Sequence, residues 1–161
     1  IALGNVLLPY FSKLTIDNPE KSFKTLFMLN KWIFIVIMSI MVIACVFSND
    51  IIAFLFERDS FTANDTAIVS KIQIIYLIGV PFIICGNLFV KFLTSINKNA
   101  FMAYVSLGSM LLNIILDFIL MNWVGLIGIA LCTTIIQILK IFVFYNYTNK
   151  QKRLLTVSTH S

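Results

Sequence analysis

Four long apolar stretches alternate with shorter polar segments along this chain. They cover residues 32–47, 72–90, 100–121 and 124–145. A helix that crosses a bilayer needs roughly 20 mostly apolar residues. The stretches are continuously apolar, whereas the strands of a membrane barrel alternate apolar and polar positions over about ten residues. The pattern therefore predicts an all-α polytopic transmembrane helical bundle with four full spans.

Two shorter apolar segments accompany these spans. Residues 51–56 follow Asp50 and are expected to form a separate short apolar piece. Residues 1–8 are mostly apolar and precede Pro9. Because helices commonly end near a proline, we interpret residues 1–8 as the last two turns of a fifth helix that ends at Pro9.

The second span carries two local signals. Thr62 and Asp65 have the spacing of a capping box, with Asp in the place of the usual Glu or Gln, which predicts the start of a helix leading into the span. Pro81 and Gly86 interrupt the apolar run. Both residues are tolerated in membrane helices, and we expect them to bend this one.

Basic residues distinguish the two ends of the spans. The connections before the first span, between the second and third, and after the fourth hold four, two and three Lys or Arg residues, whereas the other two connections hold two and none. The positive-inside rule places the basic connections in the cytoplasm. We therefore expect a transmembrane domain over residues 1–147 and a polar cytoplasmic tail over residues 148–161.

Composition supports a membrane protein and excludes other classes. Apolar residues make up 60 % of the chain, charged residues 12 %, and the mean hydropathy is +0.96. These values exclude a disordered or disulfide-stapled chain and argue against a soluble enzyme. The net charge of +5 comes from loops that would face anionic lipid head groups, so it predicts no nucleic-acid partner.

Motifs that carry enzyme chemistry are not visible in the sequence. It contains no GxSxG, HExxH or P-loop motif, and its three cysteines and one histidine do not occur at metal-ligand spacing. We therefore expect neither an enzyme, nor a resident cofactor, nor a metal centre of the zinc type.

Polar residues in the third and fourth spans lie on single helical faces. They recur at spacings of three or four residues, which places each set on one face. The sets are Ser106, Ser109, Asn113 and Asp117 in the third span, and Thr133 and Gln137 in the fourth, where Ile129 lies on the same face. The spans join near Trp123, from which Asn113 and Thr133 are each ten residues away and Asp117 and Ile129 each six. Both pairs should therefore lie at matched depths.

Asp117 is the costly residue of this group. An Asp at the bilayer centre costs about 2.5–3.5 kcal/mol and rarely faces lipid. The Asp117 carboxylate, the Asn113 amide oxygen, the Thr133 hydroxyl and the Ile129 main-chain carbonyl are the hard oxygen ligands that a small cation prefers. They form a candidate cation-binding site. Two other interpretations stay open: Asp117 carries a proton, or it is hydrated at the membrane interface while Asn113 and Thr133 bond between helices.

A second polar pair lies at the cytoplasmic end of the second span. Asn87 and Lys91 are four residues apart and share a helical face. In the simpler interpretation, Lys91 extends to the lipid head groups. In the functional interpretation, the pair contacts the phosphate of a lipid head group that enters a cavity.

Five features occur in the order and spacing of one family. They are IALGNVLLPYFSK at residues 1–13, LFERDSFT at 55–62 with NDT at 64–66, YLIGVP at 76–81, Asn113, and GLIGIAL at 125–131. Together they resemble the MurJ/MviN family, the lipid II flippases of the multidrug/oligosaccharidyl-lipid/polysaccharide exporter superfamily. The resemblance covers residues 1–147, about a third of a typical member. Residues 97–101, NKNAF, depart from it because they replace a proline-containing DTxTP.

The resemblance implies that these spans are helices nine to twelve of a fourteen-helix flippase fold. It implies the C-terminal part of a lipid II flippase, multi-pass in the bacterial inner (cytoplasmic) membrane and active in peptidoglycan synthesis by cation-coupled alternating access. The implied partners are membrane lipids, an undecaprenyl-linked sugar substrate and N-terminal helices of the same protein. Na⁺ or H⁺ would be the coupling ion, and a further ligand would come from the seventh helix.

Three alternatives stay open at this point. A sister exporter would move another polyprenyl-linked oligosaccharide or a drug with the same architecture. A truncated remnant would have no transport function. A membrane-embedded sugar polymerase or ligase would need catalytic groups in large external loops, and the only sizeable external loop contains no histidine.

Overall fold

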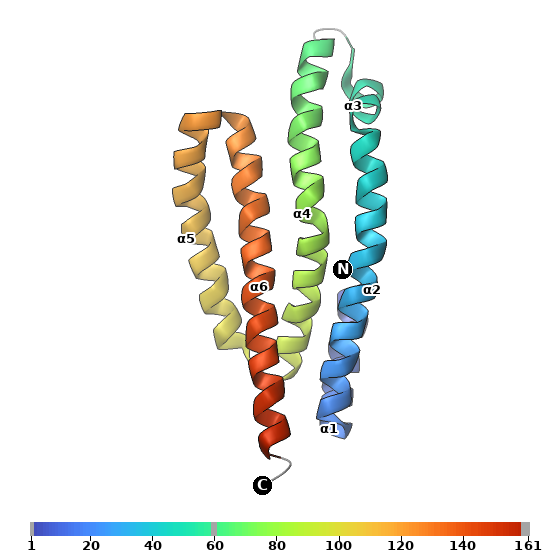
Figure 1. Ribbon diagram of the computed structural model, residues 1–161, viewed down its shortest axis with the longest axis vertical. Coiled ribbons are helices and arrows are strands. Elements are labelled where there is room, and N and C mark those ends of the chain that lie inside the picture. The colour runs from blue at the N-terminus through green and yellow to red at the C-terminus, as the bar shows by residue number, and fades with distance from the viewer. Residues whose placement is uncertain (1, 59–60, 159–161) are drawn as a thin grey trace.

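The computed structural model describes residues 2–58 and 61–158, which form six α-helices in the order shown in Figure 1. The helices are α1 (Ala2–Asp17), α2 (Pro19–Val46), α3 (Ser48–Phe56), α4 (Ala63–Ser95), α5 (Asn99–Val124) and α6 (Leu126–Ser158). The helices α2, α4, α5 and α6 are long and apolar enough to cross a membrane. This confirms the four expected spans, and α3 confirms the short piece after the first.

Local side-chain bonds explain where α2 and α4 begin. The Asn18 side chain accepts a hydrogen bond of 2.9 Å from the main-chain N–H of Lys21, and Pro19 occupies the first helical position, which needs no N–H donor. In α4, the Asp65 carboxylate accepts from the Thr62 main-chain N–H at 2.9 Å, and the Thr62 hydroxyl accepts from the Asp65 N–H at 3.5 Å. The predicted capping box is therefore confirmed.

The prediction that the first helix ends at Pro9 is wrong. The helix α1 runs through Pro9 to Asp17, and Asn18 separates it from α2. Pro9 itself is exposed, and it removes one hydrogen bond within the helix without ending it. The polar stretch before the first span is thus mostly helical. At the other end, α6 continues without a break into the polar tail as far as Ser158.

Residues 97–101, where the sequence departs from its resemblance, cover the end of the turn between α4 and α5 and the first three residues of α5. Asn97 has a φ of 57°, in the left-handed region that Asn tolerates better than most residues. The N–H of Asn97 donates to Thr94 O at 3.0 Å and that of Lys98 to Leu93 O at 2.9 Å. These bonds end α4 and start α5 without a proline.

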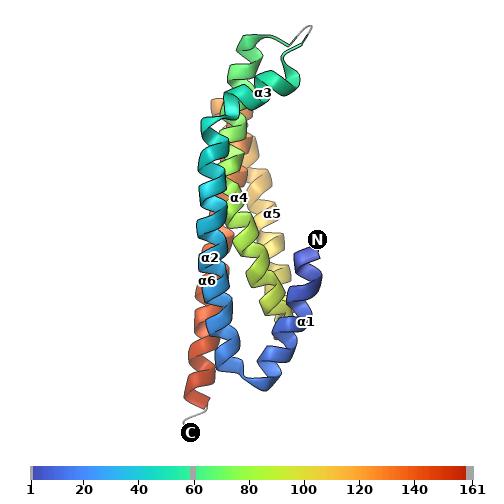
Figure 2. The ribbon, with the colours of Figure 1, turned by 90° about the vertical axis from the view of Figure 1, so that its right-hand side faces the viewer.

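The helix α4 lies at the centre of the bundle and contacts α1, α2, α3, α5 and α6. It is one continuous helix across Pro81 and Gly86, and its lower half leans away from α2, in keeping with the predicted bend (Figure 2). Beside the lower half of α4 lies α1, which contacts both α4 and α2 (Figure 2).

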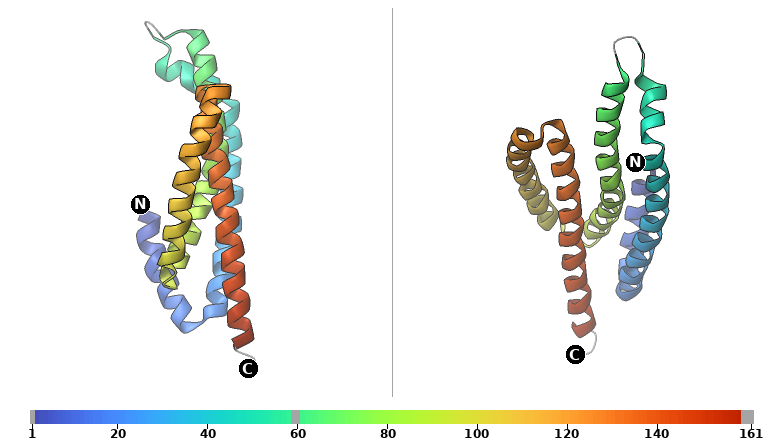
Figure 3. Two further views of the ribbon diagram at one scale, coloured as in Figure 1. Left: turned by 90° about the vertical axis from the view of Figure 1, so that its left-hand side faces the viewer. Right: turned by 45° about the horizontal axis from the view of Figure 1, so that its top comes forward.

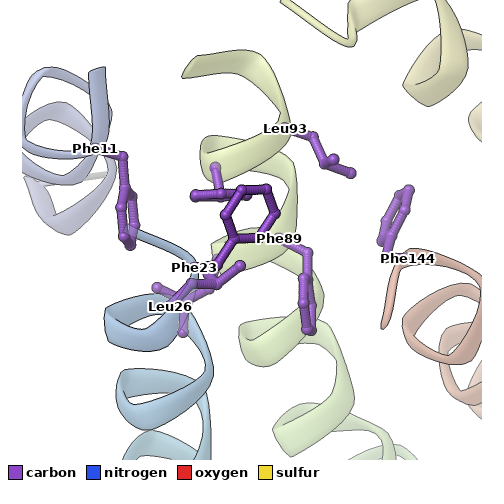
Figure 4. Close-up of a cluster of buried hydrophobic side chains, with 8 residues drawn as sticks. Phe11, Phe23, Leu26, Phe89, Leu93 and Phe144 are labelled. Carbon is purple, nitrogen blue, oxygen red and sulfur yellow. The ribbon is translucent and has the colours of Figure 1, made fainter. Parts of the chain in front are cut away.

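A cluster of aromatic and aliphatic side chains fills the lower end of the bundle (Figure 4). Its fully or almost fully buried members come from α1, α2, α4 and α6. They are Phe11, Phe23, Leu26, Leu88, Phe89, Phe92, Leu93 and Phe144. The Phe92 ring packs edge-on against Phe11 and Phe23, at centroid distances of 5.4 and 4.8 Å. This cluster ties four helices into one body.

By contrast, α5 is attached at one side of the bundle, where it forms an antiparallel hairpin with α6 (Figure 3). The hairpin turns at Gly125, whose φ of +67° favours glycine. No described residue of α5 is fully buried, and large apolar side chains such as Tyr104 and Phe118 are exposed. The outer face of α5 is therefore available for lipid or further protein.

Candidate functional site

Asn113 of α5 contacts α6 at the depth that the sequence predicts. The Asn113 side-chain amide donates to the Cys132 sulfur at 3.6 Å, and the Cys132 thiol donates to the Asn113 main-chain oxygen at the same distance. Cys132 precedes Thr133, the residue expected opposite Asn113. The structure therefore confirms the matched depth of the two helices, and it places Cys132, rather than Thr133, in contact with Asn113.

Asp117 lies one helical turn from Asn113 and belongs to the same cluster. The side chain is half-buried, and its carboxylate interacts with Cys132. Its Oδ1 atom is buried and has no hydrogen-bond partner within the described residues. An unpartnered buried polar atom is costly, and it requires an explanation such as an ion, a water molecule or a further protein group.

Thr133 and Ile129 form the other half of the predicted set. The Thr133 hydroxyl donates to the Ile129 main-chain oxygen at 3.1 Å, one turn back along α6. Both residues are half-buried. A cation that used the Ile129 carbonyl would compete with this bond, and it would gain the Thr133 oxygen if the hydroxyl rotated away.

The predicted set thus consists of a carboxylate and an amide on α5 and a hydroxyl and a main-chain carbonyl on α6, and the contacts that join the two helices at this level run through Cys132. Oxygen donors of this kind suit Na⁺ or a proton better than a soft transition metal. The described residues contain no group of three His, Cys, Asp or Glu side chains that could hold a metal ion. These properties leave Asn113, Asp117, Ile129 and Thr133 as a candidate cation site in which Asp117 supplies the charge.

Sequence reasoning missed Cys132 as a member of this site. The cysteine is fully buried and interacts with both Asn113 and Asp117 of α5. Its spacing from Asn113 matches the hairpin register, but a cysteine within an apolar run is typical of simple packing. A rotation of about 100° separates Cys132 from Thr133 around α6, and counting residues from the turn gives depth but not rotation.

Asn87 and Lys91, the second predicted pair, share a face of α4 as expected and make no hydrogen bond to each other within the described residues. Asn87 is exposed and Lys91 is half-buried, one turn apart on α4. Asn87 borders a small cavity between α4 and α6, and the lysine on that cavity is Lys140 of α6. The structure thus places a different cation beside Asn87.

A further polar contact inside the bundle was not predicted. Asn30 of α2 is buried, and its side-chain amide donates to the Cys85 main-chain oxygen of α4 at 3.2 Å. The Cys85 thiol donates back to the Asn30 main-chain oxygen at 3.7 Å. As in the α5–α6 hairpin, an Asn and a Cys join two helices, but here the amide donates to the main-chain oxygen of the cysteine and not to its sulfur.

Comparisons with known proteins identify the family. The sequence model of the family described as "Lipid II flippase MurJ" matches residues 1–160. A curated relative, the lipid II flippase MurJ of Thermosipho africanus (strain TCF52B), is 36 % identical over 118 residues, which are 71 % of this chain and 24 % of the relative.

A solved structure gives the same answer. The structure of a lipid II flippase MurJ in an inward closed conformation superimposes with a TM-score of 0.75 and 31 % sequence identity, covering 91 % of this chain and 31 % of that one. The chain thus spans about a quarter to a third of the length of these relatives. Its four apolar spans match part of a multi-pass membrane protein with the fourteen-helix fold. The chain belongs to the lipid II flippase MurJ family.

Proposed function

We propose that this chain forms part of a flippase that moves lipid II, the lipid-linked peptidoglycan precursor, across the bacterial inner membrane during cell-wall synthesis. The proposal rests on the match of the family model to residues 1–160. Because the chain spans only part of its relatives, the transporting unit would include helices outside this sequence. An undecaprenyl-linked sugar would be the substrate and the surrounding lipids its environment.

The transport mechanism would be alternating access, in which helical bundles rock around a central substrate site and no covalent bond is made or broken. The described helices supply a suitable rigid body. The aromatic cluster joins α1, α2, α4 and α6, and the Asn30–Cys85 pair holds α2 against α4. The α5 arm of the hairpin lacks such a core, so it is the described element best able to change its packing.

A monovalent cation, Na⁺ or H⁺, would couple to this motion at Asp117. The observation that carries this part of the proposal is the buried Asp117 Oδ1 atom, which has no partner within the described residues. A cation or proton at Asp117 would remove the cost of that buried carboxylate oxygen. Asn113 and Thr133 would add oxygen ligands, and a residue from a helix outside this sequence would complete the site.

The substrate is tested in proteoliposomes that contain the full-length polypeptide carrying this sequence. A membrane-impermeant reductant bleaches a fluorescent lipid II analogue only in the outer leaflet. Movement of the analogue from the inner to the outer leaflet is therefore measured as loss of the protected fluorescence. We expect translocation well above that of protein-free vesicles. Equal rates with and without protein would contradict the proposal, and faster movement of a different polyprenyl-linked oligosaccharide would assign the chain to a sister exporter.

A further inference from the structure

A small cavity of about 110 Å³ opens between α4 and α6. Three polar side chains border it: Asn87 from α4, and Gln137 and Lys140 from α6. The remaining wall is made by Phe82, Ile83, Gly86, Val90 and Phe144. A Cβ atom built on Gly86 would meet no other atom within 4 Å, so the cavity is open along this side of α4. One water needs only about 10–15 Å³ of such space, so a group of several atoms fits.

The three polar side chains have no protein partner within the part of the chain that the structure describes. No hydrogen bond or ion pair involves the side chains of Asn87, Gln137 or Lys140. Asn and Gln each offer an N–H₂ donor, and Lys offers three donors and a positive charge. A set of donors with one net positive charge complements an anion with several acceptor oxygens.

The depth of the cavity matches the level of lipid head groups. Lys140 lies 17 residues after Trp123, the turn at the opposite side of the membrane, which corresponds to about 25 Å of helix. The hydrocarbon core of a bilayer is about 30 Å thick, so Lys140 lies just inside its cytoplasmic boundary. Asn87 lies four residues before Lys91, which places it about 6 Å inside the same boundary. A lysine at this depth either extends to the head groups or binds an anionic group beside it.

We propose that Asn87, Gln137 and Lys140 bind the phosphate group of an anionic membrane lipid at the cytoplasmic boundary. The lipid phosphate would supply the acceptor oxygens and negative charge that these donors lack, and the apolar wall would contact the adjoining glycerol and upper acyl chain. The site replaces the Asn87–Lys91 pair expected from the sequence, because Lys91 does not border the cavity. It does not depend on the proposed transport of lipid II.

The test measures equilibrium binding of radiolabelled dioleoylphosphatidylglycerol to the full-length polypeptide in a nonionic detergent. Lys140→Gln should weaken binding about tenfold, because it removes a charge-assisted hydrogen bond. Lys91→Gln is the matched control, since it removes the same charge one helical turn from Asn87 and away from the cavity. Lys140→Arg should retain most of the affinity.

A second variant tests the cavity without changing charge. Gly86→Leu should fill the space and weaken lipid binding while leaving the protein folded, because a side chain there meets open space and leucine favours a helix. Inorganic phosphate, added as competitor, should not displace the lipid. Displacement by inorganic phosphate would show that the site binds a soluble anion, and it would contradict the proposal that the bound phosphate belongs to a lipid. Unchanged binding in Lys140→Gln or Gly86→Leu, or equal losses in Lys140→Gln and Lys91→Gln, would overturn the site itself.

Discussion

Gly128 of α6 packs directly against the backbone of Leu120 in α5. A Cβ atom built on Gly128 would overlap the Leu120 main-chain oxygen, and the Leu120 Cβ would lie only 2.9 Å away. The α5–α6 hairpin therefore closes by backbone contact just beyond Gly125. Small residues allow membrane helices to approach in this way, and here the approach sets the register that brings Asn113 to Cys132.

This contact predicts opposite effects for two glycine substitutions. Gly108→Ala in α5 meets no atom within 4 Å, so it should stabilise the helix by about 0.5–1 kcal/mol. Gly128→Ala forces the backbones apart and should destabilise the protein by about 1–3 kcal/mol. Thermal unfolding of the full-length polypeptide in detergent measures both. A Gly128→Ala variant as stable as Gly108→Ala would contradict the close packing.

The hydrogen bonds between Asn30 and Cys85 predict that removing the Asn30 side chain weakens the packing of α2 against α4 and lowers the free energy of unfolding. Asn30→Ala should cost roughly 0.6–1.7 kcal/mol, the range found for hydrogen bonds between membrane helices, because the Cys85 carbonyl loses its side-chain donor. Asn146→Ala is the matched control, since Asn146 is exposed on α6. Unfolding in a denaturing detergent compares the two variants. Equal stabilities would show that the Asn30 bond contributes nothing.

The capping box predicts local fraying at the start of α4. Thr62→Ala removes the acceptor for the Asp65 N–H and should cost about 0.5–2 kcal/mol in the first turn. Hydrogen exchange of the amides of residues 63–67 should become faster, while exchange at the core cluster around Phe92 stays unchanged. Asn64→Ala, at an exposed position beside the cap, should leave exchange as it is. Protection unaffected by Thr62→Ala would rule out the cap.

The main features of the fold could be predicted from continuous apolar runs, but the helix ends could not. Lysines spread over residues 13–31 indicated a loop, whereas α1 and α2 occupy that segment except for Asn18. The signal for the boundary was present, because Asn18 followed by Pro19 is typical of a helix N-terminus. Pro9 was a misleading signal, since a proline at an exposed position can be accommodated within a helix.

The candidate site could be predicted in depth but not in detail. Periodicity placed Asn113 and Asp117 on one face, and the turn at Trp123 gave the level of their partners on α6. The α6 side chain that contacts Asn113 and Asp117 depends on how α6 is rotated about its own axis. The contact between Gly128 and Leu120 determines that rotation. The cavity beside Lys140 could not be predicted, because it depends on how α4 packs against α6.

The account also predicts that Asp117→Asn uncouples the transporter from its cation. The substitution keeps the shape of the side chain but removes the charge that a cation or proton would neutralise. We expect lipid II translocation by the variant to fall on the order of tenfold and to lose its response to Na⁺ and to pH, in line with typical coupling between two sites. Asp50→Asn, at an exposed position of α3, should behave like the unmodified protein.

The most direct measurement is lipid II translocation by the full-length polypeptide in proteoliposomes, recorded with Na⁺ and then with K⁺ in its place, each at several pH values. The account predicts that the unmodified protein responds to Na⁺ or to pH, that Asp50→Asn keeps this response, and that Asp117→Asn loses it. Translocation by Asp117→Asn at the normal rate, with the normal response to both Na⁺ and pH, would contradict the role given to the Asp117 carboxylate.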